Sequence, residues 1–332
     1  MPRVVHAPGR VNLVGDHTDY VGGLVLPMAI DAGVTITTEP RATVVELRSR
    51  IDDVPCVFEL PFTEDPARID PPWARFVAAM AQQVDATVGM RGTVDSTLPA
   101  GAGLSSSAAL LCAVGIALDF EGTAHDLATA ARRAEHAATG VPTGIMDQLC
   151  IASAVEGHAV LIDCRSEEVE PVLVPSDARI AVRLVEPRTL VGSGYAARVD
   201  ECAQVEAQIG PLRDATLADV SSLTDEALHK RARHVVTENE RVATAAAAFR
   251  SGDLRAVGAA MNDGHASLRD DFEISTPTID AAIEATRSIE GVHGARMTGG
   301  GFGGSIVALT TPTTDLGDEW TVVHPSGPAR VL

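Results

Sequence analysis

Lysine is almost absent from this chain: Lys230 is the single lysine among 332 residues, although Lys and Arg together number 26. It follows no glycine-rich loop, which excludes both a GxxxxGK[ST] phosphate loop and the strand lysine of a protein kinase. Nucleotide phosphates, if this protein binds them, must therefore be held by backbone N–H groups and arginine.

Cysteine is also scarce, and the five that occur are widely spaced. The nearest two, Cys150 and Cys164, are fourteen positions apart, so neither a zinc cluster nor a disulfide framework is expected. The N-terminal residues contain no apolar signal-peptide core. The longest apolar run, 108–118, is too short to cross a bilayer and predicts a buried helix instead. We expect a cytoplasmic protein.

Basic residues are outnumbered by 45 Asp and Glu, which gives a formal net charge of −19. Such a surface repels phosphate backbones and anionic lipids, so the sequence predicts neither a nucleic-acid partner nor a membrane partner. The rest of the composition is typical of a globular protein. A chain of this length folds as one large or two medium domains, and we place the domains at 1–175 and 176–332, with the junction near Pro175.

The hydrophobic patterns predict an α+β fold. Strand patterns occur at 4–6, 34–38, 43–48, 92–98, 158–163, 178–185, 305–310 and 320–323. Helical patterns occur at 72–84, 104–118, 123–139, 195–209, 225–249, 254–261 and 278–289. No repeating βαβ period appears, and the second half is mostly helical, which favours α+β over a doubly wound sheet.

The first of three glycine-rich segments, residues 8–23, is expected to form a loop after a strand. It carries six polar or aromatic side chains suited to a polyhydroxylated ligand, because each sugar hydroxyl both donates and accepts hydrogen bonds. These are Arg10, Asn12, Asp16, His17, Asp19 and Tyr20. The simpler alternative is a surface turn rich in Asp and Gly.

The second segment, 98–110, passes from glycines to three serines and then to an Ala/Leu helix. A loop that ends at a helix N-terminus collects unpaired N–H groups and the positive end of the helix dipole, and so forms an anion site. It could hold phosphate without lysine. The alternative is ordinary N-capping by one serine.

The third segment, 297–305, has five glycines in six positions, which costs chain entropy. Close backbone approach to a ligand or to a neighbouring strand would compensate for that entropy cost.

Between the second and third segments, Asp147 lies in an apolar stretch, where a buried carboxylate needs a partner or a functional role. Glu135 precedes it on a predicted helix, with a solvated ion pair to Arg132 as the simpler interpretation.

Together these segments resemble the motifs of the GHMP small-molecule kinases and, within them, the galactokinase family. Residues 9–20, GRVNLVGDHTDY, are similar to the galactokinase sugar signature. Residues 101–109, GAGLSSSAA, resemble the ATP-binding loop of the superfamily, and 298–304, TGGGFGG, its third motif. The resemblance implies an ATP-dependent sugar 1-kinase that acts on α-D-galactose. It also implies two domains, the N-terminal one similar to domain 2 of ribosomal protein S5, with the active site between them.

The resemblance implies a role for each matching residue. Arg10 would stabilise charge on the transferring phosphoryl group, and Asp147 would be the catalytic carboxylate, acting as a base or orienting the hydroxyl. The sugar would be bound by Asp16, His17, Thr18, Asp19 and Tyr195. The ATP phosphates would be bound by Gly101, Ala102, Gly103, Leu104, Ser105, Ser106 and Ser107. Ser107 and Glu135 would hold Mg²⁺, which prefers hard oxygen ligands.

Two departures from the family pattern keep alternatives open. Asp16 stands where most galactokinases have Glu, and residues 183–188 replace the usual Asn-x-x-Val-Arg-His stretch before the pocket tyrosine. Both changes suit a GHMP kinase for another monosaccharide. A non-catalytic sugar and ATP sensor is the third possibility, although the serine-alanine stretch is intact. Sugar and ATP are the expected partners, and we expect a monomer or weak oligomer.

Overall fold

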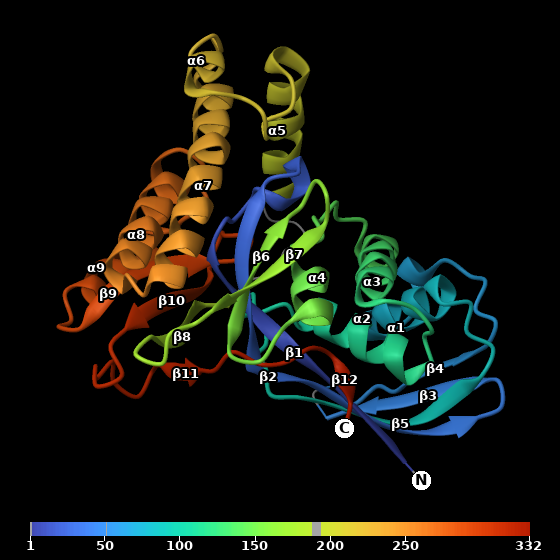
Figure 1. Ribbon diagram of the computed structural model, residues 1–332. Coiled ribbons are helices and arrows are strands. Elements are labelled where there is room, and N and C mark those ends of the chain that lie inside the picture. Colours follow the sequence, from blue (N-terminus) through green and yellow to red (C-terminus); the bar gives the residue numbers. More distant parts are fainter. Residues whose placement is uncertain (1, 51, 188–193) are drawn as a thin grey trace.

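The chain folds into two β-sheets, each covered by helices (Figure 1). The computed structural model describes residues 2–50, 52–187 and 194–332. In these residues the larger sheet has eight strands, six in the order β12-β1-β2-β5-β3-β4, with β6 and β7 extending from β2. The strands are β1 (Arg3–Val14), β2 (Leu24–Arg41), β3 (Val44–Ser49), β4 (Cys56–Glu59), β5 (Gly89–Ser96), β6 (His158–Asp163), β7 (Glu168–Leu173) and β12 (Arg330–Val331).

Four helices cover one face of the larger sheet. They are α1 (Pro72–Gln83), α2 (Ser106–Ala117), α3 (Ala124–Thr139) and α4 (Met146–Ser153). The helices α2 and α4 lie directly on β1 and β2, and α1 and α3 pack over α2. Nine of the residues of α2 are buried, which explains why this helix is apolar on every side and confirms the buried helix predicted over 108–118.

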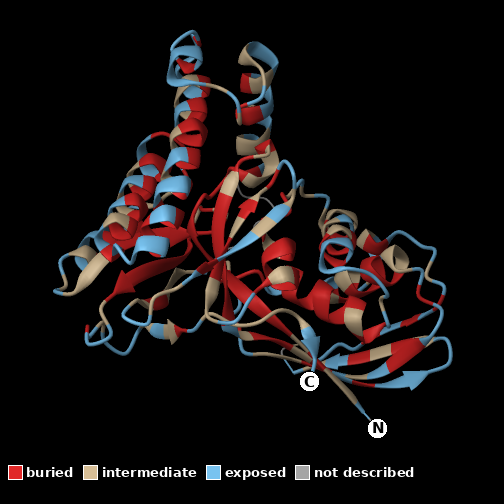
Figure 2. Ribbon diagram, viewed as in Figure 1, coloured by how far each residue is buried: buried red, intermediate tan, exposed pale blue. Residues whose placement is uncertain are grey.

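The smaller sheet is antiparallel, with the strand order β11-β8-β10-β9. Its strands are β8 (Arg179–Glu186), β9 (Val292–Thr298), β10 (Gly304–Thr310) and β11 (Thr321–Val323). The helices of this half are α5 (Tyr195–Ile209), α6 (Leu217–Val220), α7 (Glu226–Ser251), α8 (Leu254–Asp270) and α9 (Pro277–Arg287). The helices α8 and α9 pack on β9, and α8 also contacts β1 of the larger sheet. The helix α7 packs against α8 and contacts β1, β2 and β7. Figure 2 shows that the central strands where the sheets meet are almost entirely buried.

The α+β prediction is confirmed, and most expected elements are present within one or two residues. The helix predicted over 254–261 is longer, because α8 continues to Asp270. The sequence Asn262-Asp263-Gly264 is typical of a turn, but Gly264 lies inside the helix. A Cβ at that glycine would lie 2.8 Å from Nη1 of the buried Arg296, so close packing explains the glycine.

The loop predicted for residues 8–23 is largely wrong. Strand β1 continues to Val14, so Arg10 and Asn12 project from a strand and not from a loop. The pairing with β2 shifts register between Pro8 and Arg10 and again between Asn12 and Val14. Only the residues after Val14 form a turn, which ends in a short 3₁₀ helix, Asp19–Val21. The bulged strand fixes Arg10 more firmly than a loop could.

The boundary placed at 175/176 lies in the connection between β7 and β8, where the chain passes from one sheet to the other. It stays a prediction, since the last strand, β12, returns to the first sheet and pairs with β1. The two termini therefore lie near each other (Figure 1). Among the described residues, no helix is both long enough and apolar enough to span a membrane.

The contact between α8 and β9 makes a stability prediction. A Cβ at Gly258 would lie 2.2 Å from the backbone oxygen of His293, so we expect Gly258→Ala to lower the free energy of unfolding by about 1–3 kcal/mol through overpacking. Urea unfolding measures this. Gly327→Ala is the matched control, because its nearest neighbour is 3.5 Å away. Equal stability of Gly258→Ala and wild type would contradict the packing described.

Candidate active site

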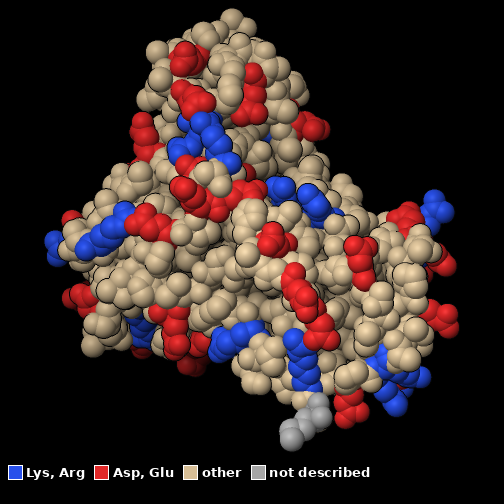
Figure 3. Space-filling model, turned by 45° about the vertical axis from the view of Figure 1, so that its right-hand side comes forward, with Lys and Arg blue, Asp and Glu red and all other residues tan. Residues whose placement is uncertain are grey.

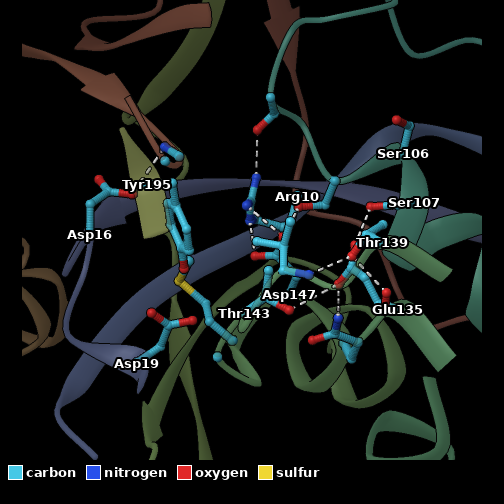
Figure 4. A pocket seen from close by; sticks show the side chains of 18 of the residues that line it. Arg10, Asp16, Asp19, Ser106, Ser107, Glu135, Thr139, Thr143, Asp147 and Tyr195 are labelled. Carbon is cyan, nitrogen blue, oxygen red and sulfur yellow. Dashed lines mark hydrogen bonds and ion pairs between the residues drawn. The ribbon is translucent and has the colours of Figure 1, made fainter. Parts of the chain in front are cut away.

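The three glycine-rich segments meet at a cavity of about 400 Å³ between the two sheets. Figure 4 shows Asp16 and Asp19 at one end and Ser106, Ser107 and Glu135 at the other. Arg10 and Asp147 lie between these two ends. The cavity therefore has two polar compartments, with one ion pair where they join.

The central ion pair is bidentate. Nε of Arg10 donates to Oδ1 of Asp147 at 2.6 Å, and Nη2 donates to Oδ2 at 2.7 Å. Nη1 donates to the backbone oxygen of Gly103 at 2.8 Å. Burial acts to lower the pKa of Arg10, but the attraction of Asp147 outweighs it and the pKa is raised. Arg10 thus carries a fixed positive charge inside the cavity.

The second segment forms a tight loop directly against that pair. Gly101, Gly103 and Ser105 all have positive φ, between 62° and 72°, which turns the chain sharply into α2. The Ser105 hydroxyl donates to Oδ2 of Asp147, and no side chain caps the N-terminus of α2. The N-capping alternative is therefore wrong. The first-turn N–H groups of α2 have no capping side chain, as an anion site requires.

Glu135 lies at the same end of the cavity, on α3. Its carboxylate accepts hydrogen bonds from Ser107 Oγ at 2.5 Å and from Gln148 Nε2 at 2.6 Å. Burial raises its pKa. The solvated ion pair with Arg132 is wrong, because Glu135 is buried. The described residues contain no cluster of three or more His, Cys, Asp or Glu able to hold a metal.

Four of the five predicted sugar-binding side chains reach the other end of the cavity. Asp16, His17, Asp19 and Tyr195 all line it. The rings of His17 and Tyr195 lie against each other, with centroids 5.1 Å apart. Thr18 does not line it; its hydroxyl donates to the backbone oxygens of Gly15 and Leu24 and stabilises the turn.

Asp19 occupies an unusual position beside the start of α4. A Cβ at Gly144 would lie 2.0 Å from Oδ2 of Asp19, so only glycine leaves room for this carboxyl. Burial and the negative charge of Asp147 raise the pKa of Asp19 to about 7. A carboxyl that titrates near neutrality can either donate or accept a hydrogen bond at the cavity wall.

Models of protein families match three parts of the chain. The galactokinase galactose-binding signature matches residues 1–40, the N-terminal domain of GHMP kinases matches 74–155, and the C-terminal domain of GHMP kinases matches 245–319. Galactokinase from Bos taurus is 43% identical over 326 residues, covering 92% of this chain and 83% of the bovine protein. Galactokinase from Chloroflexus aurantiacus is 40% identical, with the same coverage.

The chain belongs to the galactokinase family. Its fold is the two-domain GHMP-kinase fold: Lactococcus lactis galactokinase, crystallised with galactose, superposes with a TM-score of 0.92 at 30% identity. That match covers the whole of this chain and 95% of the other. Mevalonate kinase from Methanococcus jannaschii shares the fold alone, with a TM-score of 0.71 at 16% identity.

The galactokinase-family cavity also uses residues that sequence reasoning missed. They are Phe76, Thr139, Val141, Thr143, Gly144, Met146 and Gln148. Gly299 and Gly300 line the cavity too, and they belong to the third glycine-rich segment, for which close approach to a ligand was one interpretation. Gln148 directly follows Asp147, so its place on α4 could have been foreseen. Phe76 could not, because one aromatic residue in a helix is typical of a core. Of the predicted ATP loop, Ala102 and Leu104 do not line the cavity; both are buried in the core.

The raised pKa of Asp19 gives a pH prediction. We expect the Asp19 carboxyl to titrate with a midpoint of about 7, followed by ¹³C NMR and assigned with Asp19→Asn. Because the folded pKa exceeds the unfolded value, the stability from this group is present below about pH 4 and lost as the pH rises through the folded pKa.

The contribution of Asp147 to the raised pKa of Asp19 can be tested separately from that of burial. Asp147→Asn takes away a neighbouring negative charge, so the midpoint of Asp19 should fall. A wild-type midpoint below about pH 5, close to the ordinary range for Asp, would contradict the environment described for Asp19.

Proposed function

We propose that this chain transfers the γ-phosphoryl group of ATP to the C1 hydroxyl of α-D-galactose. The proposal rests on the position of the Arg10–Asp147 pair in the cavity (Figure 4). The pair lies between the end lined by Asp16 and Asp19 and the end lined by Ser106, Ser107 and Glu135. Such a pair can contact donor and acceptor together. Membership of the galactokinase family and the likeness to a galactose-bound relative support the same substrate.

Residues 101–107 would bind the ATP phosphates through the backbone. The uncapped N-terminus of α2 supplies N–H groups and the positive end of a helix dipole. Arg10 supplies the positive side-chain charge at the centre of the cavity. Local structure thus provides the attraction for phosphate that the net charge of −19 opposes.

Ser107 and Glu135 fit a magnesium ion that accompanies the nucleotide. Their oxygens lie 2.5 Å apart at the ATP end of the cavity, and both are hard ligands of the kind that Mg²⁺ prefers. Two protein ligands suffice, because Mg²⁺ in kinases keeps waters and binds substrate phosphates. When bound, the ion would neutralise phosphate charge. Gln148 holds the second Glu135 oxygen and so orients the carboxylate.

Asp147 would accept the proton of the C1 hydroxyl, or orient that hydroxyl, as its oxygen attacks the γ-phosphorus. The bond from the γ-phosphorus to the bridging oxygen breaks, and ADP leaves. Arg10 would stabilise the negative charge on the phosphoryl group during its transfer. Ser105 and Arg10 together fix both oxygens of Asp147, which provides the positioning that phosphoryl transfer requires.

The remaining sugar hydroxyls would be bound by Asp16, His17, Asp19 and Tyr195, with Thr18 stabilising the turn that carries the first three.

The cytoplasmic setting and the monomeric or weakly oligomeric state stay predictions. All five cysteines lie in the described residues and are buried and unpaired, which suits a reducing compartment. On the face shown in Figure 3, Lys and Arg are interspersed with Asp and Glu and form no continuous basic surface.

A sugar panel tests the substrate. With MgATP, we expect the highest kcat/KM on D-galactose, compared with arabinose, galacturonic acid and galactosamine in an ADP-release assay. Chelation of the metal should stop turnover. A higher kcat/KM on another sugar would overturn the assignment of galactose, and no turnover on any sugar would favour a sensor.

Substitution of the catalytic carboxylate tests the mechanism. Asp147→Asn keeps the shape but cannot accept the proton, so we expect kcat to fall by about 100-fold or more. Circular dichroism at the assay temperature should remain unchanged, while the melting temperature should fall, because Asn leaves the buried charge of Arg10 without its partner. Asp163→Asn is the control, because Asp163 pairs with Arg213 outside the cavity. A near-wild-type kcat for Asp147→Asn would exclude its proposed role.

A further inference from the structure

Among the residues that the structure describes, Arg296 is the bulkiest fully buried side chain, and it carries a charge. It projects from β9 between two buried carboxylates. Nη2 contacts Oδ2 of Asp16 at 2.7 Å, and Nη1 contacts Oε1 of Glu238 at 2.9 Å. A buried arginine is tolerated only when its charge is paired and its N–H groups are hydrogen-bonded. Here Nε of Arg296 also donates to the backbone oxygen of Met297.

This cluster joins three segments that are distant in sequence: the sugar-signature turn, α7, and β9 with the glycine-rich turn that directly follows it. Glu238, on α7, accepts the backbone N–H of Gly15 at 2.8 Å and pairs with Arg241. Asp16 accepts the backbone N–H of Gly299 at 3.0 Å. The sugar-signature turn, α7, β9 and the third glycine-rich turn are therefore held against one another by buried charge-assisted hydrogen bonds.

Of the charged side chains of the cluster, Asp16 lines the cavity, and Arg296 and Glu238 do not. Its carboxylate has about four acceptor positions, and the cluster uses two of them, one on each oxygen. A hydroxyl donor in the cavity would use one of the remaining positions. Burial raises the pKa of Asp16, and the positive charge of Arg296 opposes that shift. Without Arg296, this carboxyl would be buried with no buried cation in contact.

We propose that Arg296 is a positioning residue for the sugar: it fixes the Asp16 carboxylate at the cavity wall so that it can accept a hydrogen bond from a sugar hydroxyl. This inference rests on the proposed sugar-kinase function and deepens it. Arg296 itself does not line the cavity, so its effect on the sugar must pass through Asp16. Glu238 anchors the opposite side of the guanidinium.

The test is Arg296→Lys, which keeps the charge but cannot bridge two carboxylates. We expect the KM for the sugar to rise about 10-fold or more, with the KM for ATP within about 2-fold of wild type. Asp16→Asn should raise the sugar KM as well. In the double variant the two losses should not add, because both act through one carboxylate.

Arg231→Lys is the matched control for a purely structural loss. Arg231 is also buried and also pairs with two carboxylates, those of Glu201 and Glu273, at 2.6 and 2.7 Å. It does not line the cavity. We expect this variant to lower the melting temperature without changing either KM by more than about 2-fold.

Three outcomes overturn the proposal. They are an unchanged sugar KM in Arg296→Lys, equal losses for sugar and ATP, or additive losses in the double variant. Should Arg296→Lys fail to fold, Glu238→Gln replaces it, since it removes the opposite anchor while preserving shape. A sugar KM raised about 3-fold or more then supports the proposal, and an unchanged one overturns it.

The proposed function fails separately from this inference. Wild-type turnover on galactose tests the function alone. All variants are compared with wild type on whichever sugar the wild type phosphorylates best, so a different substrate leaves the test of Arg296 intact.

Discussion

The bidentate ion pair between Arg10 and Asp147 is the constraint on which the site depends. Arg10 comes from the first strand and Asp147 from the first turn of α4, so the pair ties the larger sheet to its helical layer. Breaking a largely buried pair leaves an uncompensated charge, which is strongly destabilising. The same pair stands between the two ends of the cavity, where phosphoryl transfer would need a positive charge beside an acceptor for a proton.

The scarcity of lysine is consistent with the way in which the rest of the cavity is built. Phosphate binding by backbone N–H groups requires the chain to approach the ligand closely, and glycine permits this at Gly101 and Gly103, where φ is positive. The third glycine-rich turn also brings backbone to the cavity, from the smaller sheet. Its Gly299 lines the cavity and donates its backbone N–H to the Asp16 carboxylate. Two sheets can therefore share one site without any lysine side chain in its lining.

Sequence reasoning predicted the local features well and the long-range ones poorly. Helices such as α5, Tyr195–Ile209, follow from apolar periodicity and need no tertiary information. The strand that carries Arg10 was mistaken for a loop, because its glycine and polar residues mask the bulges that place them. The Arg296–Asp16 contact joins positions 280 apart, and no local pattern encodes such a pair. The roles expected for Arg10 and Asp147 came from the resemblance to a family. Their hydrogen-bond partners, such as Ser105 and the backbone oxygen of Gly103, are known only from the structure.

A crystal structure with galactose and a non-hydrolysable ATP analogue tests the central claim most directly. We expect the C1 hydroxyl within hydrogen-bonding distance of Asp147, with the terminal phosphate beside Arg10 and residues 101–107. A sugar bound with C1 turned away from Asp147, or phosphates outside the start of α2, would contradict it.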